Sequence, residues 1–182
     1  MKHEIKNSAL IIIDLINDFN FKHGSLLSKN TLNIIDNIVI LRQFFINNKL
    51  PIIYVNDNYQ VWTGNYLDIV DRCYNNVSCR IIDKIFPGND EYFVTKNKFS
   101  AFYCTNLEPL LRQLNITTLV LVGIAGNVCI YFSAVDAHMR NFKLFVPSDC
   151  IASNYIKDNN IALKSMKHLL DADISISSDL TI

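Results

Sequence analysis

Ala9–Phe19 reads ALIIIDLINDF, an uninterrupted apolar run over Ala9–Ile13 that is followed at once by Asp14. A short run this apolar and this rich in β-branched residues is typical of a strand buried on both faces. Such strands belong to parallel sheets with helices on each side. We therefore predict a central strand over Ala9–Ile13 that places Asp14 at its carboxyl end.

Similar apolar runs recur along the chain and alternate with amphipathic segments. Further strands are predicted over Pro51–Val55, Tyr92–Thr95, Thr118–Val122, Lys143–Val146 and Asp173–Ile176. Helices are predicted over Thr31–Asn48, Asn106–Leu114, Asn127–Asn141 and Asp158–Leu170. This alternation predicts an α/β fold, a doubly wound parallel six-stranded sheet in an α/β/α sandwich, Rossmann-like with strand order 3-2-1-4-5-6.

The length and the patterning also bear on domain organisation. The 182 residues contain no stretch that reads as a linker, a repeat or a low-complexity tract, so residues 1–182 are expected to form a single domain. One stretch, Asn56–Gly88, is polar and weakly patterned. We interpret it as a long irregular excursion, a lid or a pocket wall.

The composition excludes several kinds of partner. The 17 basic and 17 acidic residues cancel and form no basic stripe, so nothing favours nucleic acid or an anionic membrane. The five cysteines, an odd number without a C-x-x-C pair or zinc-type spacing, indicate free thiols in a reducing cytosol. The apolar runs are too short for a signal peptide or a membrane span. We expect a cytoplasmic protein that acts on a small-molecule substrate.

Polar side chains follow several of the predicted strands. Asp14 follows the first strand, Asn56 the second, Lys96 and Lys98 the third, and Cys129 lies shortly after the fourth. In doubly wound folds ligands bind outside the carboxyl ends of the strands. An acid, a base and a thiol are therefore expected to converge on one rim of the sheet.

Cys129 is a candidate nucleophile. It lies just inside a helix that should begin near Asn127, a good N-cap residue. The helix dipole is expected to lower the thiol pKa, and the N–H groups of the first turn can stabilise an oxyanion. The alternative is a buried structural cysteine, the commoner fate of a free thiol.

A thiol nucleophile needs a base, and Asp14 is better placed than any histidine. His138, nine residues after Cys129 on the same predicted helix, points the opposite way, and His23 reads as a surface loop residue. Asp14 terminates a buried strand, so its carboxylate should be partly desolvated and able to carry a proton. A lysine near both groups would stabilise either anion, and spacing alone leaves Lys96 and Lys98 open.

Three segments, in order, resemble the isochorismatase-like cysteine hydrolases: Ala9–Phe19 (ALIIIDLINDF), Val94–Phe102 (VTKNKFSAF) and Gly123–Ile130 (GIAGNVCI). Each motif alone is weak, but the ordered set is specific and spans nearly the whole chain. The resemblance implies a catalytic triad of Asp14, Lys96 and Cys129, and so chooses Lys96 over Lys98. It also implies a cis peptide between Ile124 and Ala125, and an oxyanion hole formed by the backbone N–H groups of Ala125 and Cys129.

The chain departs from the family pattern at Ile16, where glutamine is common, and at Gly126, where threonine is usual. Nicotinamidases of this superfamily build a metal site from Asp and His residues after the second strand. Residues 56–62 contain no histidine, so we expect no metal and no cofactor. Four residues are expected to contact the substrate: Phe19, Asn56, Trp62 and Phe102.

The resemblance implies a hydrolase that cleaves a C–N bond of a small amide or ureido-type substrate through a thioester, because the cysteine is present. Three alternatives remain: an ester, an isochorismate-like enol ether, or a non-catalytic redox or ligand-binding module in which Cys129 is a sensor thiol. A nucleotide-binding domain is disfavoured, since no G-x-G-x-x-G or P-loop motif occurs. A homo-oligomer, a dimer or tetramer, is also expected.

Overall fold

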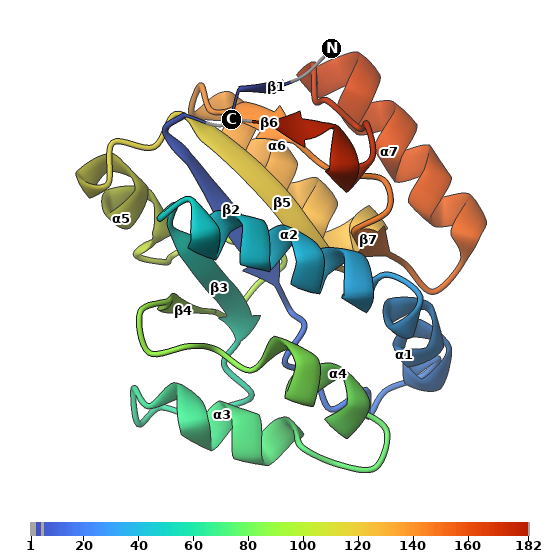
Figure 1. The fold of residues 1–182 in the computed structure, drawn as a ribbon. Helices are drawn as coiled ribbons and strands as arrows, with labels where there is room; N and C mark the ends of the chain where they lie inside the picture. Colours follow the sequence, from blue (N-terminus) through green and yellow to red (C-terminus); the bar gives the residue numbers. More distant parts are fainter. Residues whose placement is uncertain (1–2, 5, 182) are drawn as a thin grey trace.

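The centre of the protein is a parallel β-sheet with helices on both faces (Figure 1). The computed structural model describes residues 3–4 and 6–181, and over these residues the main sheet has six strands. Their bounds are β2 (Ser8–Ile13), β3 (Ile52–Asp57), β4 (Tyr92–Lys96), β5 (Thr118–Ile124), β6 (Lys143–Phe145) and β7 (Ile151–Ala152). A separate parallel pair joins β1 (His3–Glu4) to β8 (Leu180–Thr181).

The strand order is β4-β3-β2-β5-β6, and β7 pairs with β5 beyond the end of β6. This confirms the predicted doubly wound sheet, with the order 3-2-1-4-5 plus a sixth strand. The sixth strand is β7, whereas the segment predicted to supply it, 173–176, makes only one parallel bridge, Phe145 to Asp173. The side chain of Asp173 accepts hydrogen bonds from the backbone N–H and the hydroxyl of Ser175.

The side chains of β2 alternate between the two faces of the sheet and so build two cores. Leu10 and Ile12 pack in one cluster, whereas Ile11 and Ile13 pack in the other. The first is covered by α1 (Gly24–Leu32), α2 (Ile35–Asn47), α3 (Tyr66–Cys73) and α4 (Cys79–Ile85). The second is covered by α5 (Leu107–Gln113), α6 (Tyr131–Met139) and α7 (Ile156–Leu170). In Figure 1, α2 crosses in front of the sheet and α6 lies behind β5, which gives the predicted three layers.

The polar stretch 56–88 is more ordered than its sequence indicates. It contains α3 and α4, where the sequence predicted an irregular excursion. Each helix is at most eight residues long, too short for its apolar spacing to stand out. The predicted helix over 31–48 is likewise split, with α1 ending at Leu32 and α2 beginning at Ile35. Among the described residues, no helix has both the length and the apolarity that a membrane crossing needs.

Candidate active site

Three strand ends bring Asp14, Lys96 and Cys129 together. Asp14 directly follows β2, Lys96 is the last residue of β4, and Cys129 lies in the turn that follows β5. The Nζ atom of Lys96 is 2.8 Å from Asp14 Oδ2 and 3.6 Å from Cys129 Sγ. The sequence therefore correctly placed these three side chains at one rim, although their catalytic roles remain a prediction.

Asp14 is fixed by the neighbouring strand β3. Its backbone N–H donates to Val55 O at 3.1 Å, and its Oδ1 accepts the backbone N–H of Asp57 at 2.9 Å. The other carboxylate oxygen, Oδ2, faces Lys96. Asp14 has a left-handed backbone conformation, with φ of 52°, which aspartate tolerates better than most residues. The carboxylate is therefore held in one orientation by contacts on both of its oxygens.

The three donor hydrogens of Lys96 each have an acceptor. Besides Asp14 and Cys129, Lys96 Nζ donates to the backbone carbonyl of Lys98 at 3.1 Å. Lys98 is exposed and contributes only this carbonyl oxygen to the group. The geometry thus separates the two lysines that spacing alone left open, since Lys96 is the one in contact with both the acid and the thiol.

Cys129 lies in a π-helical turn, η1 (Gly126–Ile130), which leads into α6. The peptide between Ile124 and Ala125 is cis, as the resemblance implied. The N-cap residue of this turn is Ala125, and no side chain of the turn caps it. The prediction that Asn127 is the N-cap is therefore wrong. The backbone N–H of Asn127 instead donates to Ser153 Oγ, from a distant part of the chain, at 3.1 Å.

Burial dominates the electrostatics of the site. It raises the pKa of Asp14, against the opposing charge of Lys96. Burial, and next the charge of Asp14, also raise the pKa of the Cys129 thiol to about 12, although Lys96 and a backbone hydrogen bond from Ala125 lower it. The expected fall of the thiol pKa is therefore wrong for the resting site, because desolvation outweighs the positive helix end.

For Lys96, burial lowers the pKa, but interactions with Asp14 and, whenever it is ionised, with Cys129 outweigh the burial, so the pKa is raised. Lys96 and Asp14 are placed as an ion pair, and burial favours a neutral thiol on Cys129. Such a thiol becomes a nucleophile only when a base takes its proton, and Asp14 is the base within reach.

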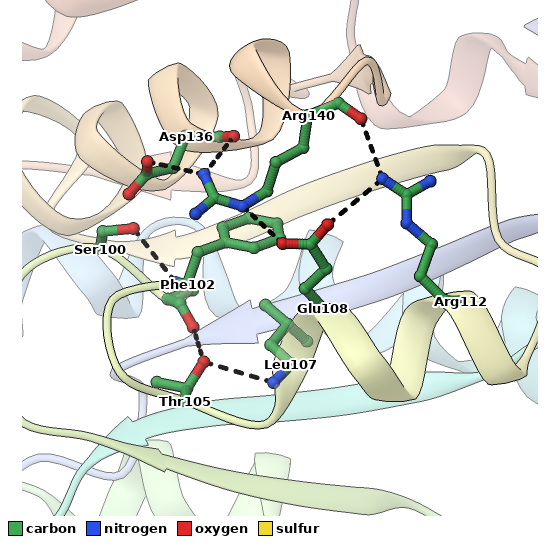
Figure 2. A network of polar contacts seen from close by, with 9 residues as sticks. Ser100, Phe102, Thr105, Leu107, Glu108, Arg112, Asp136 and Arg140 are labelled. Atoms are coloured by element: carbon green, nitrogen blue, oxygen red, sulfur yellow. Dashed lines mark hydrogen bonds and ion pairs between the residues drawn. The ribbon is translucent and has the colours of Figure 1, made fainter.

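Three of the four residues expected to contact substrate are buried and contact other parts of the protein, and a substrate contact by them stays a prediction. Asn56 is 1% exposed, and its side chain accepts the N–H of Ile16 at 3.1 Å and donates to the carbonyl of Ile16 at 2.8 Å. Phe102 is 6% exposed and lies under the guanidinium of Arg140, 5.0 Å from the ring centroid (Figure 2). Phe19 is 5% exposed and belongs to the core cluster beneath α1–α4.

Trp62 is the exception, because it is 77% exposed. It lines a groove of about 500 Å³ together with Asn58, Tyr66, Phe93 and Asn97. Asn58, one of the lining residues, donates its backbone N–H to the backbone carbonyl of Lys96 at 3.2 Å. A substrate contact by Trp62 stays a prediction.

A polar network joins the loop after β4 to the helix that follows Cys129. Ser133 on α6 is completely buried, and its hydroxyl accepts the N–H of Ala101 at 2.8 Å. Figure 2 shows Arg140, the C-cap residue of α6, bound to Glu108 of α5 and to Asp136. Each ion pair measures 2.8 Å. The sequence did not single out Ser133, although it lies four residues after Cys129 on one predicted helix, a spacing that places both on the same face.

The residues after β3 do not fit a metal site of the Asp and His type. Asp57 Oδ1 accepts the N–H of Tyr59 at 2.8 Å, and Asn58 Oδ1 accepts the N–H of Gln60 at 3.0 Å. These side-chain oxygens are thus engaged by their own loop. Across residues 3–4 and 6–181, no group of three or more His, Cys, Asp or Glu side chains is placed to bind a metal.

The isochorismatase domain family model matches residues 8–176. An uncharacterized isochorismatase family protein of Bacillus subtilis (strain 168) is 42% identical over 174 residues, which is 96% of this chain and 96% of that protein. The chain therefore belongs to the isochorismatase family and is a hydrolase.

Solved structures agree with this assignment. The N-carbamoylsarcosine amidase from Thermoplasma acidophilum aligns with a TM-score of 0.74 and 27% identity, covering 94% of this chain and 97% of that one. The nicotinamidase from Staphylococcus aureus aligns with a TM-score of 0.73 and 26% identity, covering 93% and 98%. Both are relatives that this chain resembles in fold and in sequence.

Proposed function

We propose that the protein cleaves a C–N bond of a small amide or ureido-type substrate through a thioester on Cys129. The observation that carries the proposal is the contact of one ammonium, that of Lys96, with both the Asp14 carboxylate and the Cys129 thiol, at 2.8 and 3.6 Å. The names of the two structural neighbours, an amidase of a carbamoyl compound and a nicotinamidase, support C–N bond cleavage.

The first step transfers a proton and forms the carbon–sulfur bond. Because burial keeps the thiol neutral, Asp14 takes its proton as the sulfur attacks the substrate carbonyl. The backbone N–H groups of Ala125 and Cys129 bind the resulting oxyanion. Lys96 stays protonated and offsets the negative charge that passes from the carboxylate to the intermediate.

The second half of the cycle releases both products. Asp14 returns the proton to the departing nitrogen, the C–N bond breaks and the thioester remains. Water then gives a proton to Asp14 and attacks the thioester. The carbon–sulfur bond breaks, the acid product leaves, and the proton returns to the Cys129 sulfur.

The alternatives fit the geometry less well. A redox sensor needs a thiol that ionises readily, whereas burial raises the pKa of Cys129 to about 12. An ester would pass through the same thioester, so it remains a second substrate class for the same site. Cleavage of an enol ether proceeds by protonation, so the Cys129 thiol would have no role in that reaction.

The test is a screen of small amides and ureido acids, read as ammonia release. The wild type is compared with Cys129→Ala and with Cys104→Ala, a control at an exposed thiol. We expect turnover by the wild type and the control, none by Cys129→Ala, and an acyl adduct on Cys129 by mass spectrometry after a rapid acid quench. Near wild-type turnover by a folded Cys129→Ala protein would contradict the proposal.

A further inference from the structure

Gly126, the first residue of the nucleophile turn η1, has no space for a side chain. A Cβ atom there would lie 2.1 Å from Asn159 Oδ1, and 3.1 Å from both Ser153 Oγ and Ile151 Cδ1. Gly126 does not have a positive φ, so the backbone itself would accept another residue. Glycine is therefore required by a neighbour, and that neighbour is the side chain of Asn159 on α7.

Asn159 belongs to a chain of hydrogen bonds whose direction is determined. The N–H of Asn127 donates to Ser153 Oγ at 3.1 Å. The single hydroxyl hydrogen of Ser153 donates to Asn159 Oδ1 at 2.8 Å, and Asn159 Nδ2 donates to the carbonyl of Ile151 at 3.3 Å. Because Asn159 takes the hydroxyl hydrogen, a lone pair of Ser153 is turned toward Asn127.

These hydrogen bonds provide an acceptor for the backbone N–H of Asn127, at the start of the turn that carries Cys129. The first N–H groups of a helix have no acceptor within the helix, and no side chain of η1 caps it. Ser153, which lies outside the turn, supplies an acceptor for the N–H of Asn127, and Asn127 is two residues before Cys129.

Ser153 is itself firmly placed. It is 2% exposed, and its carbonyl accepts the side-chain amide of Asn30 at 2.9 Å. The strand before it, β7, pairs with β5 through Gly123 and Ile124. The acceptor for Asn127 is therefore fixed to the same strand from which the nucleophile turn departs.

We propose that Ser153 and Asn159 are positioning residues for Cys129. They hold the turn so that the sulfur of Cys129 stays beside Asp14 and Lys96, and Gly126 leaves the space that Asn159 needs. This inference rests on the proposed role of Cys129 as nucleophile. Neither residue needs to touch the substrate, since both act through the backbone of Asn127.

The first test compares Ser153→Ala and Asn159→Ala with Asn160→Ala, an exposed control on the same helix. We expect kcat for amide hydrolysis to fall roughly ten- to hundredfold in the first two variants, because small displacements of reacting groups cost this much. KM should change little, and the control should match the wild type. Asn159→Asp keeps the acceptor oxygen and should retain more activity than Asn159→Ala. Equal losses in Asn159→Asp and Asn159→Ala would overturn the positioning role.

A second readout needs no substrate and so stands apart from the proposed function. Iodoacetamide labelling at pH 8 is measured as the ratio of Cys129 to the exposed Cys104 within each molecule, well below the unfolding temperature. Displacing the turn should relieve the burial that raises the thiol pKa, so the ratio should rise in Ser153→Ala and Asn159→Ala. An unchanged ratio in both variants would overturn the inference, even if no amide were hydrolysed.

A double-mutant comparison tests the contact at Gly126. Gly126→Ala alone should lower stability and raise the labelling ratio, because its new methyl group meets Asn159. Gly126→Ala combined with Asn159→Ala should be less impaired than the two single effects predict, since the obstructing oxygen is gone. Simple additivity of the two changes in unfolding free energy would contradict the assigned contact.

Discussion

The ammonium of Lys96 and the carboxylate of Asp14 form an ion pair of 2.8 Å across the end of β3, although β4 and β2 are not neighbours in the sheet. Both side chains are almost fully buried, 2% and 9% exposed. The backbone N–H of Asp57, at the end of β3, bonds the carboxylate oxygen that Lys96 leaves open. A buried pair of this kind is costly to break, because removing one partner leaves an uncompensated charge.

Replacing Lys96 should therefore destabilise the protein far more than replacing Lys98. We expect Lys96→Met to lower the free energy of unfolding by about 3 kcal/mol. Lys98→Met should change it by less than about 0.5 kcal/mol, because this residue is exposed. Urea unfolding at neutral pH measures both. Similar losses of unfolding free energy in the two variants would show that the ion pair between Lys96 and Asp14 does not account for the destabilisation.

The ion pair between Lys96 and Asp14 should also determine the pH below which activity is lost. Asp14 must be ionised to take the thiol proton, so kcat/KM should fall as the pH drops through its pKa. Burial raises that pKa, so the midpoint should lie above 3.8, the ordinary value for aspartate. Lys96→Met removes the opposing charge and should move the midpoint still higher, which a pH profile of residual activity measures. A midpoint that moves down in this variant would show that another group limits the rate.

The strands were predictable because their apolar runs are short, continuous and rich in β-branched residues, as in Ala9–Ile13. Asp14 and Lys96 could then be placed, since any residue that ends a parallel strand lies at the rim. The direction of a side chain could not be predicted in this way. Asn56 and Asp57 are adjacent at the end of β3, yet Asn56 turns inward to bond Ile16.

Contacts between segments that are distant in the sequence could not be predicted either. Ser153 caps the turn at Asn127 from 26 residues away, and nothing in the local pattern of either residue indicates the partner. The thiol pKa was mispredicted for a similar reason. The helix end is a local feature that the sequence reveals, whereas the burial of Cys129 is produced by the packing of several elements.

Asn56 should behave as a structural residue. Asn56→Ala leaves the N–H and carbonyl of Ile16 without their side-chain partner in a buried site, so we expect a loss of about 2 kcal/mol in unfolding free energy. Chemical denaturation measures this loss, with Asn20→Ala as an exposed control. KM of the folded variant should stay close to the wild-type value. A large rise in KM without loss of stability would instead support the substrate contact that the sequence suggested.

Chelation should leave activity unchanged. The side-chain oxygens of Asp57 and Asn58 already accept hydrogen bonds from their own loop, and no histidine occurs over residues 56–62. Activity is measured after prolonged dialysis against EDTA and again after addition of zinc or iron. Loss on chelation followed by recovery with either metal would refute this expectation.

Lys96 should also control the reactivity of the thiol. Its charge lowers the pKa of Cys129, so Lys96→Met should raise that pKa further and slow alkylation by iodoacetamide at neutral and mildly alkaline pH. Peptide mapping follows Cys129, and the exposed Cys104 of the same molecule serves as the reference. Lys98→Met is the matched control and should label like the wild type, because only its backbone carbonyl contacts the site. If Lys98→Met rather than Lys96→Met slows the labelling, the charge that stabilises the thiolate comes from Lys98. If neither does, the thiolate is stabilised mainly by the backbone N–H of Ala125.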